Sequence, residues 1–416
     1  MTSTDRADLV VVGAGTIGGW ASTFAALDGI GKVVVVERGI AGQGASSRAA
    51  GIVRAQGGTP TTVALGRWSI DFYRSQTDHF GTDSGFRELG YVILAVTEED
   101  ERAGRERVAM QRAAGLDVRW LSAPEAAAVD PTLSPDGHRG GSFLATDGHI
   151  DPPRNVRAYS LAMQRVGVEL RERTAFTGLR TEAVAGRAQR VVAVETDRGV
   201  IETERVLLTG GPGLRAVGRL AGIRIPAGAV RHSVAVLEPH EAFADRQPMV
   251  FDIGAGLYWR LEEGGLLFGW SDPNDQPGEA REIDWTMYEA MRERLAGFVP
   301  VTRGLGLRKI WAATIDFTPD HLPILGPGLS AADGTRIEGV TVASAGGHGM
   351  MWGPAVARIA ADLARTGKTA LVGVSDLGLD RFDETGRSRL ATDPIALQFP
   401  VDAEGDEALI VPTGAG

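Results

Sequence analysis

The stretch LVVVGAGTIG, residues 9–18, decides the fold. Its apolar run predicts a buried parallel strand, and the glycines that follow predict a tight turn into a helix over residues 20–27. A second buried strand is predicted at residues 32–37. Glycines in such a turn let the backbone approach a pyrophosphate, which the positive end of the helix stabilises. Glu37 ends the second strand, where a carboxylate accepts hydrogen bonds from an adenosine ribose. The opening therefore predicts a dinucleotide site, without distinguishing FAD from NAD.

The composition is that of an ordinary globular protein. The chain has 416 residues, of which 43% are hydrophobic and 23% charged, and its formal net charge is -10. This length favours two domains with a ligand cleft between them. The negative charge and the lack of a basic run argue against a nucleic-acid or anionic-membrane surface. We find no secretory signal and no apolar stretch near the ~20 residues of a membrane span, and we therefore expect a cytoplasmic protein.

Thiolate and metal chemistry are not expected. The sequence has no cysteine, which excludes disulfides, iron–sulfur clusters and a cysteinyl link to a flavin. The seven histidines show no HxH or HExxH spacing, and no carboxylate cluster resembles a cation loop. We predict no catalytic metal. A GxSxG nucleophile motif is also absent, so acyl transfer lacks a candidate nucleophile.

The segment GQGASSRAAGIVR, residues 42–54, directly follows the predicted ribose-binding strand. A loop of small residues with two arginines suits a chain laid against a pyrophosphate and an isoalloxazine ring. Here the sequence resembles the D-amino-acid oxidase superfamily, and within it the sarcosine oxidase and dimethylglycine dehydrogenase branch. The resemblance continues through LLTGGPG at 207–213, WAATIDFTPD at 311–320 and AGGHGM at 345–350. It covers nearly the whole chain and favours FAD.

Together these patterns predict an α/β (α+β) protein, in which a Rossmann-like FAD-binding domain is interleaved with an antiparallel-sheet substrate domain. We assign residues 1–88, 146–223 and 313–390 to the FAD-binding domain, 89–145 and 224–312 to the substrate-binding domain, and 391–416 to a C-terminal tail. Further strands are predicted at 90–96, 141–145, 168–172, 190–196, 199–204, 205–209, 230–238, 257–261, 265–270 and 340–344, and helices at 98–114, 155–166, 283–298 and 354–365.

The resemblance implies that FAD is bound non-covalently. The position where some relatives attach flavin through cysteine matches Ala313, and residues 44–47 hold no histidine for the other known attachment. The backbone of 346–350 would line the pyrimidine edge of the flavin, with the start of the last helix pointing at the ring. The predicted cofactor-binding residues are Gly13, Gly15, Thr16, Ile17, Gly18, Glu37, Arg38, Ala45, Ser46, Ser47, Arg48, Gly51, Ile52, Phe176, Gly210, Gly211, Gly346, Gly347, His348, Gly349 and Met350.

The substrate end departs from the family pattern. Relatives that act on small amino acids fix the substrate carboxylate with an arginine at the position of Ile315 or a lysine at that of Met351. Arg54 remains, either as the carboxylate anchor or as an ion pair that holds the flavin loop. The oxygen-activating lysine of the family would fall near Leu267, where no cation stands. O2 and another electron acceptor therefore both stay open, as do oxidase and dehydrogenase activities.

Several side chains have both a chemical and a structural interpretation. Asp316 would attract an ammonium substrate or cap the turn before Pro319. His348 would act as a base toward an alcohol or shape the glycine turn. Tyr258, with tryptophans 259, 270, 311 and 352, would line an apolar pocket or pack in the core. The predicted catalytic residues are Arg54, His348, Asp316, Met351 and Tyr258.

These features predict the oxidation of a C–N bond in an amino acid, an N-methyl amino acid or a secondary or cyclic amine. A neutral amine passes hydride from its α-carbon to flavin N5, and water hydrolyses the imine, so no side-chain base is required. Two alternatives stay open. One is the C–O oxidation of a 2-hydroxy acid, with His348 as the base. The other is a flavin-carrying subunit that acts through partner proteins, since the sequence leaves the oligomeric state open.

Overall fold

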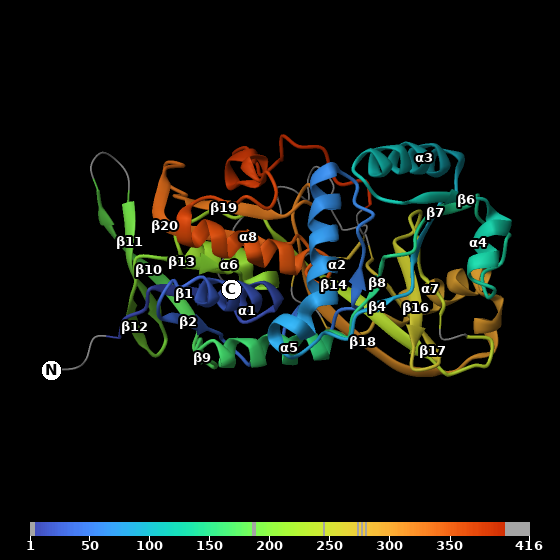
Figure 1. Ribbon diagram of the computed structural model, residues 1–416, viewed down its shortest axis with the longest axis horizontal. Coiled ribbons are helices and arrows are strands. Elements are labelled where there is room, and N and C mark those ends of the chain that lie inside the picture. Colours follow the sequence, from blue (N-terminus) through green and yellow to red (C-terminus); the bar gives the residue numbers. More distant parts are fainter. Residues whose placement is uncertain are drawn as a thin grey trace.

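The computed structural model describes residues 5–184, 189–243, 246–272, 274–275, 278 and 281–395. The strands of these residues form sheets of nine, eight and three strands. Elements of the nine-stranded sheet lie on the left of Figure 1, and those of the eight-stranded sheet lie on the right. Of the predicted tail, residues 396–416 lie outside the described residues.

The nine-stranded sheet is built around the opening strand. β1 (Leu9–Val12) pairs in parallel with β2 (Val33–Val36) and β13 (Val206–Leu208), and β13 pairs in parallel with β20 (Arg336–Ser344). The strand order is β10-β11-β20-β13-β1-β2-β9, with β12 on β11 and β19 on β20. The remaining strands are β9 (Glu169–Arg171), β10 (Phe176–Ala183), β11 (Gln189–Thr196), β12 (Gly199–Glu202) and β19 (Ile324–Leu329). The predicted Rossmann-like core is confirmed.

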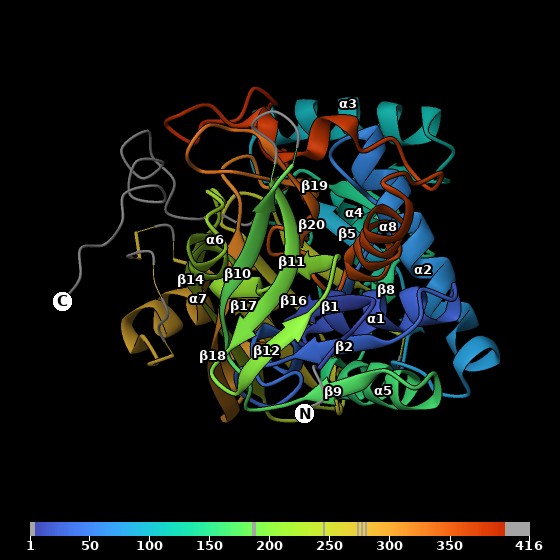
Figure 2. The same cartoon turned by 90° about the vertical axis from the view of Figure 1, so that its left-hand side faces the viewer.

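Both faces of β1 are covered by other elements. Leu9 and Val11 belong to a cluster with residues of α1 (Thr16–Leu27) and α8 (Gly353–Thr366). Val10 and Val12 belong to a second cluster, with residues of β10, β11 and β12. These three strands stand in the foreground of Figure 2. Because both faces are buried, the strand reads as a continuous apolar run instead of an alternating one.

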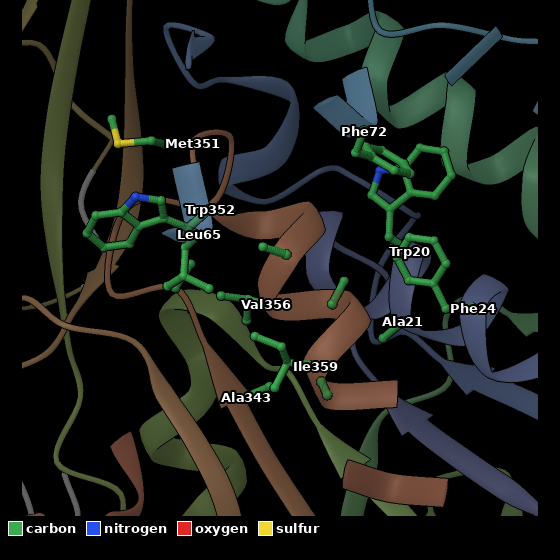
Figure 3. Close-up of a cluster of buried hydrophobic side chains, with 14 of the residues drawn as sticks. Trp20, Ala21, Phe24, Leu65, Phe72, Ala343, Met351, Trp352, Val356 and Ile359 are labelled. Carbon is green, nitrogen blue, oxygen red and sulfur yellow. The ribbon is translucent and has the colours of Figure 1, made fainter. Parts of the chain in front are cut away.

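The helix α2 (Pro60–Phe80) is a long element that the sequence analysis does not predict. Thr59 caps its start by accepting a hydrogen bond from the Thr62 amide, and proline occupies its first turn, as helix starts favour. Phe72 of α2 meets Trp20 of α1 edge-on, with ring centroids 4.9 Å apart. Figure 3 shows this aromatic cluster, together with side chains of α8. α2 therefore packs against the helical layer of the nucleotide-binding sheet.

The eight-stranded sheet has the order β18-β14-β17-β16-β15-β5-β7-β6, and its pairs are antiparallel except for β15 with β5. Its strands are β5 (Tyr91–Leu94), β6 (Arg119–Leu121), β7 (Gly141–Leu144), β14 (Gly228–Leu237), β15 (Met249–Asp252), β16 (Leu257–Glu262), β17 (Gly265–Trp270) and β18 (Leu307–Phe317). α3 (Glu98–Ala113), α4 (Ala123–Val129) and α7 (Trp285–Phe298) lie at this end of the molecule (Figure 1). The predicted boundary between residues 312 and 313 falls inside β18, which pairs with β14 as far as Phe317.

Short elements connect the two large sheets. β3 (Ile52–Val53) and β4 (Arg87–Glu88) both pair with β8 (Gly148–His149). The remaining helices are α5 (Pro152–Arg165), α6 (Leu214–Leu220), η1 (Ala45–Ser47), η2 (Gly211–Gly213), η3 (Pro300–Gly304), η4 (Ser375–Leu377) and η5 (Leu379–Arg381). The loop 42–54 therefore follows β2, forms η1, and ends at the three-stranded sheet between the two large ones.

Candidate active site

A cavity of ≈ 680 Å³ extends from the β1–α1 turn to the eight-stranded sheet. Gly13 and Glu37 line it on the nucleotide-sheet side, and Tyr91, His232 and Tyr258 line it on the other. Its volume lies within the range of roughly 300–1,000 Å³ that is common for ligand and cofactor pockets. The cavity therefore joins the predicted nucleotide site to side chains of the predicted substrate domain.

The β1–α1 turn is closely packed. Gly13 has a φ of +100°, which L side chains rarely adopt. A Cβ at Gly18 would lie 1.9 Å from the Gly13 carbonyl oxygen and 2.7 Å from Thr209 Oγ1. Thr209 Oγ1 also donates to the Val12 carbonyl at 2.8 Å. Glycine is therefore required at residue 18 because the start of α1 touches the turn itself.

Glu37 connects the end of β2 to this turn. Its carboxylate accepts hydrogen bonds from the amides of Ala14, at 2.9 Å, and Gly39, at 2.8 Å. The other predicted cofactor-binding residues that line the cavity are Gly15, Thr16, Ile17, Arg38, Ala45, Ser46, Arg48, Gly51, Ile52, Phe176, Gly210, Gly211, Gly347, His348, Gly349 and Met350. Gly18, Ser47 and Gly346 are not among the lining residues. Gly18 acts through packing, as its contact with Gly13 requires.

A buried amide supports the start of α1. The Thr16 amide and hydroxyl both lie within hydrogen-bond distance of Ser46 Oγ, at 3.0 and 3.1 Å. Asn155 Nδ2 donates to Thr16 Oγ1, and Asn155 Oδ1 accepts from Trp20 Nε1, each at 3.1 Å. The sequence analysis missed this role of Asn155, because it lies 139 residues from Thr16 and no local pattern marks it.

Residues of the eight-stranded sheet hold the loop 42–54. Arg260 Nε of β16 donates to the Ala50 carbonyl at 2.7 Å, and Trp311 Nε1 of β18 donates to the Arg48 carbonyl at 2.9 Å. Burial lowers the pKa of Arg48, and the nearby charge of Arg281 lowers it further. The loop is therefore fixed from the eight-stranded sheet, with Arg48 and Arg281 on the cavity wall.

Asp316 and the glycine turn 345–350 meet at the cavity. Asp316 lies in β18, and Ser344 Oγ donates to its Oδ2 at 2.6 Å. The Gly346 amide donates in turn to Ser344 Oγ at 3.0 Å. Burial raises the pKa of the Asp316 carboxyl. Tyr73 of the unpredicted α2 donates to the Met350 carbonyl at 2.8 Å and so holds the far end of the turn.

His348 is a poor candidate for a base. Its Nδ1–H donates to the Gly346 carbonyl at 3.0 Å, and its ring stacks on Trp352 with centroids 4.1 Å apart. Burial lowers the pKa of His348 to about 3, and the charge of Arg54 adds to this effect. A base whose conjugate acid is so strong removes an alcohol proton poorly at neutral pH.

Arg54 is a buried cation on the cavity wall. Its side chain is 3% exposed, and its guanidinium donates to the backbone carbonyls of Gln56 and, at 2.9 Å, of Ile395. Asp147 lies behind it, where its carboxylate accepts from the Ala55 amide at 2.7 Å and from Gln56 Nε2 at 3.1 Å. Burial raises the pKa of Asp147 to about 7, although the charge of Arg54 opposes that rise.

Of the five aromatic residues that would line an apolar pocket or pack in the core, one lies on the cavity wall. Tyr258 lines the cavity, whereas the tryptophans at 259, 270, 311 and 352 are not among its lining residues. Tyr258 is hydrogen-bonded to His232 Nε2, and His232 Nδ1 lies 2.8 Å from Ser271 Oγ. Burial lowers the pKa of His232 to about 4. Ile315 and Met351, at the positions of the missing family charges, also line the cavity.

Metal-binding clusters and membrane spans were sought in the described part of the chain. Residues 5–395, outside the gaps given above, contain no group of three or more His, Cys, Asp or Glu side chains arranged to hold a metal ion. Among the same residues, no helix is long and apolar enough to cross a bilayer.

The fold places this cavity between a Rossmann-like sheet and a largely antiparallel sheet. Comparison with protein families makes the class specific. A family model described as DAO, FAD dependent oxidoreductase, matches residues 8–363, and the chain belongs to this family. The predicted superfamily, FAD as its cofactor and the oxidoreductase class are thereby confirmed.

Individual relatives are more distant. The chain is 28% identical over 323 residues to 4-methylaminobutanoate oxidase (formaldehyde-forming) of Paenarthrobacter nicotinovorans, with 75% of this chain and 38% of that enzyme covered. The chain therefore spans less than half of that relative's length. It is 26% identical to sarcosine oxidase subunit beta of Rhodobacter capsulatus, covering 91% of this chain and 89% of that subunit. The fold is similar to that of L-proline dehydrogenase from P. horikoshii, with a TM-score of 0.80 at 22% identity over 88% of this chain and 96% of that one.

Proposed function

We propose that this protein oxidises the C–N bond of a small amine or amino acid with non-covalently bound FAD. The observation that carries the proposal is that neither histidine on the described cavity wall is available as a base. Both histidines there, His232 and His348, are hydrogen-bonded and have strongly lowered pKa values. A neutral amine needs no side-chain base to lose a hydride, whereas an alcohol does. Relatives named for methylamino compounds also support the oxidation of a C–N bond.

The residues present fit FAD. The Cβ-free turn at Gly13 and Gly18 gives a pyrophosphate access to backbone amides at the start of α1. Glu37 faces the cavity at the position of a ribose acceptor, and the arginine-bearing loop lies between this site and the apolar end. When bound, FAD supplies the acceptor of the hydride. The chain has no cysteine, and Ala313 stands where some relatives attach flavin, which supports non-covalent binding.

We also propose that two domains share this cavity, one for the cofactor and one for the substrate. Residues 1–88, 146–223 and 313–390 would bind the cofactor, and residues 89–145 and 224–312 would supply the substrate side. The hydrogen bonds from Arg260 and Trp311 to the loop 42–54 support this arrangement, because they connect the eight-stranded sheet to the loop that follows β2.

The substrate would carry a carboxylate and an uncharged amine. Arg54 is the buried cation suited to the carboxylate, and Ile315, Met351 and Tyr258 offer apolar surface to the rest of the molecule. The Asp316 carboxyl, held by Ser344, lies on the same wall and can accept a hydrogen bond from an amine N–H. Burial in the cavity and the positive charge of Arg54 both favour the neutral amine over its ammonium form.

The reaction balances without a metal or a side-chain nucleophile. The C–H bond at the α-carbon breaks, both its electrons leave with the hydrogen as hydride, and the amine nitrogen lone pair forms the C=N bond. Water then adds to the carbon of the resulting iminium cation, protons move from the oxygen of that water to the nitrogen, and the C–N bond breaks to give a carbonyl compound and the protonated amine or ammonia. The protein's part is to orient the α-carbon and to keep water away until the hydride has left.

A dye-linked assay tests this function. The purified chain, supplied with FAD and an artificial electron acceptor, is given panels of N-methyl amino acids, cyclic amines and 2-hydroxy acids, and the carbonyl and amine products are identified. Turnover of amines with release of both products is expected. Turnover of hydroxy acids alone would refute the proposal, and turnover by the isolated chain would refute the subunit alternative. Replacing the dye by air separates oxidase from dehydrogenase, and acid precipitation that leaves yellow colour on the protein would refute non-covalent binding.

A further inference from the structure

Residues 393–395, in the segment predicted as an irregular tail, reach the substrate side of the cavity. Ile395 is 1% exposed and lines the cavity. It belongs to a buried cluster with Tyr91, Phe251 and Tyr258, all of which also line the cavity. Residues 393–395 therefore contribute to the wall that the proposed substrate would touch.

This segment is held in place by several independent contacts. The Asp393 amide donates to the Asp320 carbonyl at 3.0 Å, and Asp393 Oδ1 accepts from the Ile395 amide at 2.8 Å. Asp320 is itself fixed by a buried ion pair with Arg381, at 2.7 and 2.9 Å. A Cβ at Gly58 would lie 2.4 Å from Asp393 Oδ1 and 2.6 Å from Pro394 Cδ. The segment thus packs directly on the backbone that follows the flavin loop.

The backbone of the segment also determines how Arg54 is presented. Arg54 Nη2 donates to the Ile395 carbonyl at 2.9 Å, and the Gln56 carbonyl accepts from Nη1. Two of the five guanidinium N–H groups are thereby bound to backbone carbonyls, and the Tyr91 hydroxyl is a further hydrogen-bond partner of Arg54. Asp393 and Arg107 contribute further charge around Arg54. The Ile395 carbonyl is therefore a positioning group for the cation.

We propose that residues 393–395 form a substrate-specificity wall, in which the Ile395 side chain limits the size of the group beside the carboxylate and the Ile395 carbonyl orients Arg54. The inference rests on the proposed function for the identity of the substrate as a carboxylate-bearing amine. It names the class more closely: the group on the α-carbon must be small and apolar to fit against Ile395, Tyr91 and Phe251.

Inert carboxylates test the wall without turnover. Acetate and phenylacetate are titrated into the FAD-loaded protein, and dissociation constants are read from the change in the visible flavin spectrum. Ile395→Ala removes the side chain but keeps the carbonyl, whereas truncation after Ala391 removes both. Truncation after Pro400 is the matched control, because it retains residues 393–395 and shortens the same end of the chain.

The expected results differ between the variants. Ile395→Ala should improve phenylacetate binding relative to acetate by about tenfold, since a pocket enlarged by a few methylenes discriminates on that scale. Truncation after Ala391 should weaken acetate binding by about tenfold, because Arg54 loses a charged hydrogen bond that orients it. Truncation after Pro400 should leave both constants within about twofold of the full chain. FAD content is measured for each protein. If the protein truncated after Ala391 does not retain FAD, the result for Ile395→Ala decides alone.

Two results would overturn the proposal: an unchanged phenylacetate-to-acetate ratio in Ile395→Ala, or a full-length protein whose flavin spectrum responds to neither acid. These outcomes are separate from the proposed function, which is judged by turnover of amines in the full-length protein. Amine turnover with an unchanged ratio refutes the wall alone. A shifted ratio without amine turnover keeps the wall and refutes the amine reaction.

Discussion

Gly18→Ala should abolish tight FAD binding. The added Cβ would lie 1.9 Å from the Gly13 carbonyl oxygen, whereas ordinary contact begins at 3.4 Å, so the start of α1 must retreat from the turn by about 1.5 Å. A shift of that size breaks amide hydrogen bonds to a bound phosphate, each of which contributes about 1.5–3 kcal/mol because the acceptor is charged. Loss of two such bonds, at the lower figure, costs about 3 kcal/mol, or about 100-fold in Kd.

Fluorescence titration of the apoprotein with FAD measures this loss. Gly297→Ala is the matched control, because it makes the same change within α7 at a site where a Cβ meets nothing within 4 Å. Alanine there should raise the free energy of unfolding by about 0.5–1 kcal/mol and leave the Kd for FAD unchanged. A Gly18→Ala protein that is folded and binds FAD within about threefold of the wild type would show that the turn does not hold the cofactor.

Two further predictions concern the buried charges at the substrate side. Arg54→Ala should raise KM for a carboxylate-bearing amine by about 100-fold while FAD content falls much less, because the variant removes a buried charged partner of the substrate; an unchanged KM would remove Arg54 from the site. Asp147 has a pKa raised by burial to about 7, so the folded state binds a proton that the unfolded chain releases near pH 4, and this group's contribution to stability is lost as pH rises toward 7. Between pH 5 and 8 the free energy of unfolding should therefore fall by about 3 kcal/mol more for the wild type than for Asp147→Asn. Urea denaturation with excess FAD measures this difference. Parallel pH profiles for the two proteins would contradict the raised pKa of Asp147.

The nucleotide half of the fold is predictable because its signals are local. The apolar β1, the glycines of the turn and Glu37 lie within 29 residues of one another, and all of them belong to the predicted dinucleotide site. The alternating strands of the second sheet are also visible in the sequence. α2 was missed because Trp68, Phe72 and Tyr73 place large aromatic side chains on several faces of the helix, where they pack against α1, the C-terminal part of the chain and one another. This obscures a simple amphipathic pattern.

The substrate half depends on contacts between distant residues. Ala50 is held by Arg260 across 210 positions, and Arg54 meets Ile395 across 341. Neither Arg260 nor Ile395 belongs to a motif. An isolated isoleucine predicts only a buried side chain. Of the tryptophans that would line an apolar pocket or pack in the core, Trp311 supports the cavity from outside through its hydrogen bond to the Arg48 carbonyl. Sequence patterns therefore specify how the cofactor is bound better than they specify which substrate is bound.

The most direct test of the central claim is an anaerobic titration of the FAD-loaded protein with an N-methyl amino acid, beside the 2-hydroxy acid of the same carbon skeleton. We expect the amine to bleach the yellow flavin absorbance in stoichiometric amount and to leave a carbonyl compound and an amine in solution, while the hydroxy acid leaves the spectrum oxidised. Bleaching by the hydroxy acid and not by the amine would contradict it.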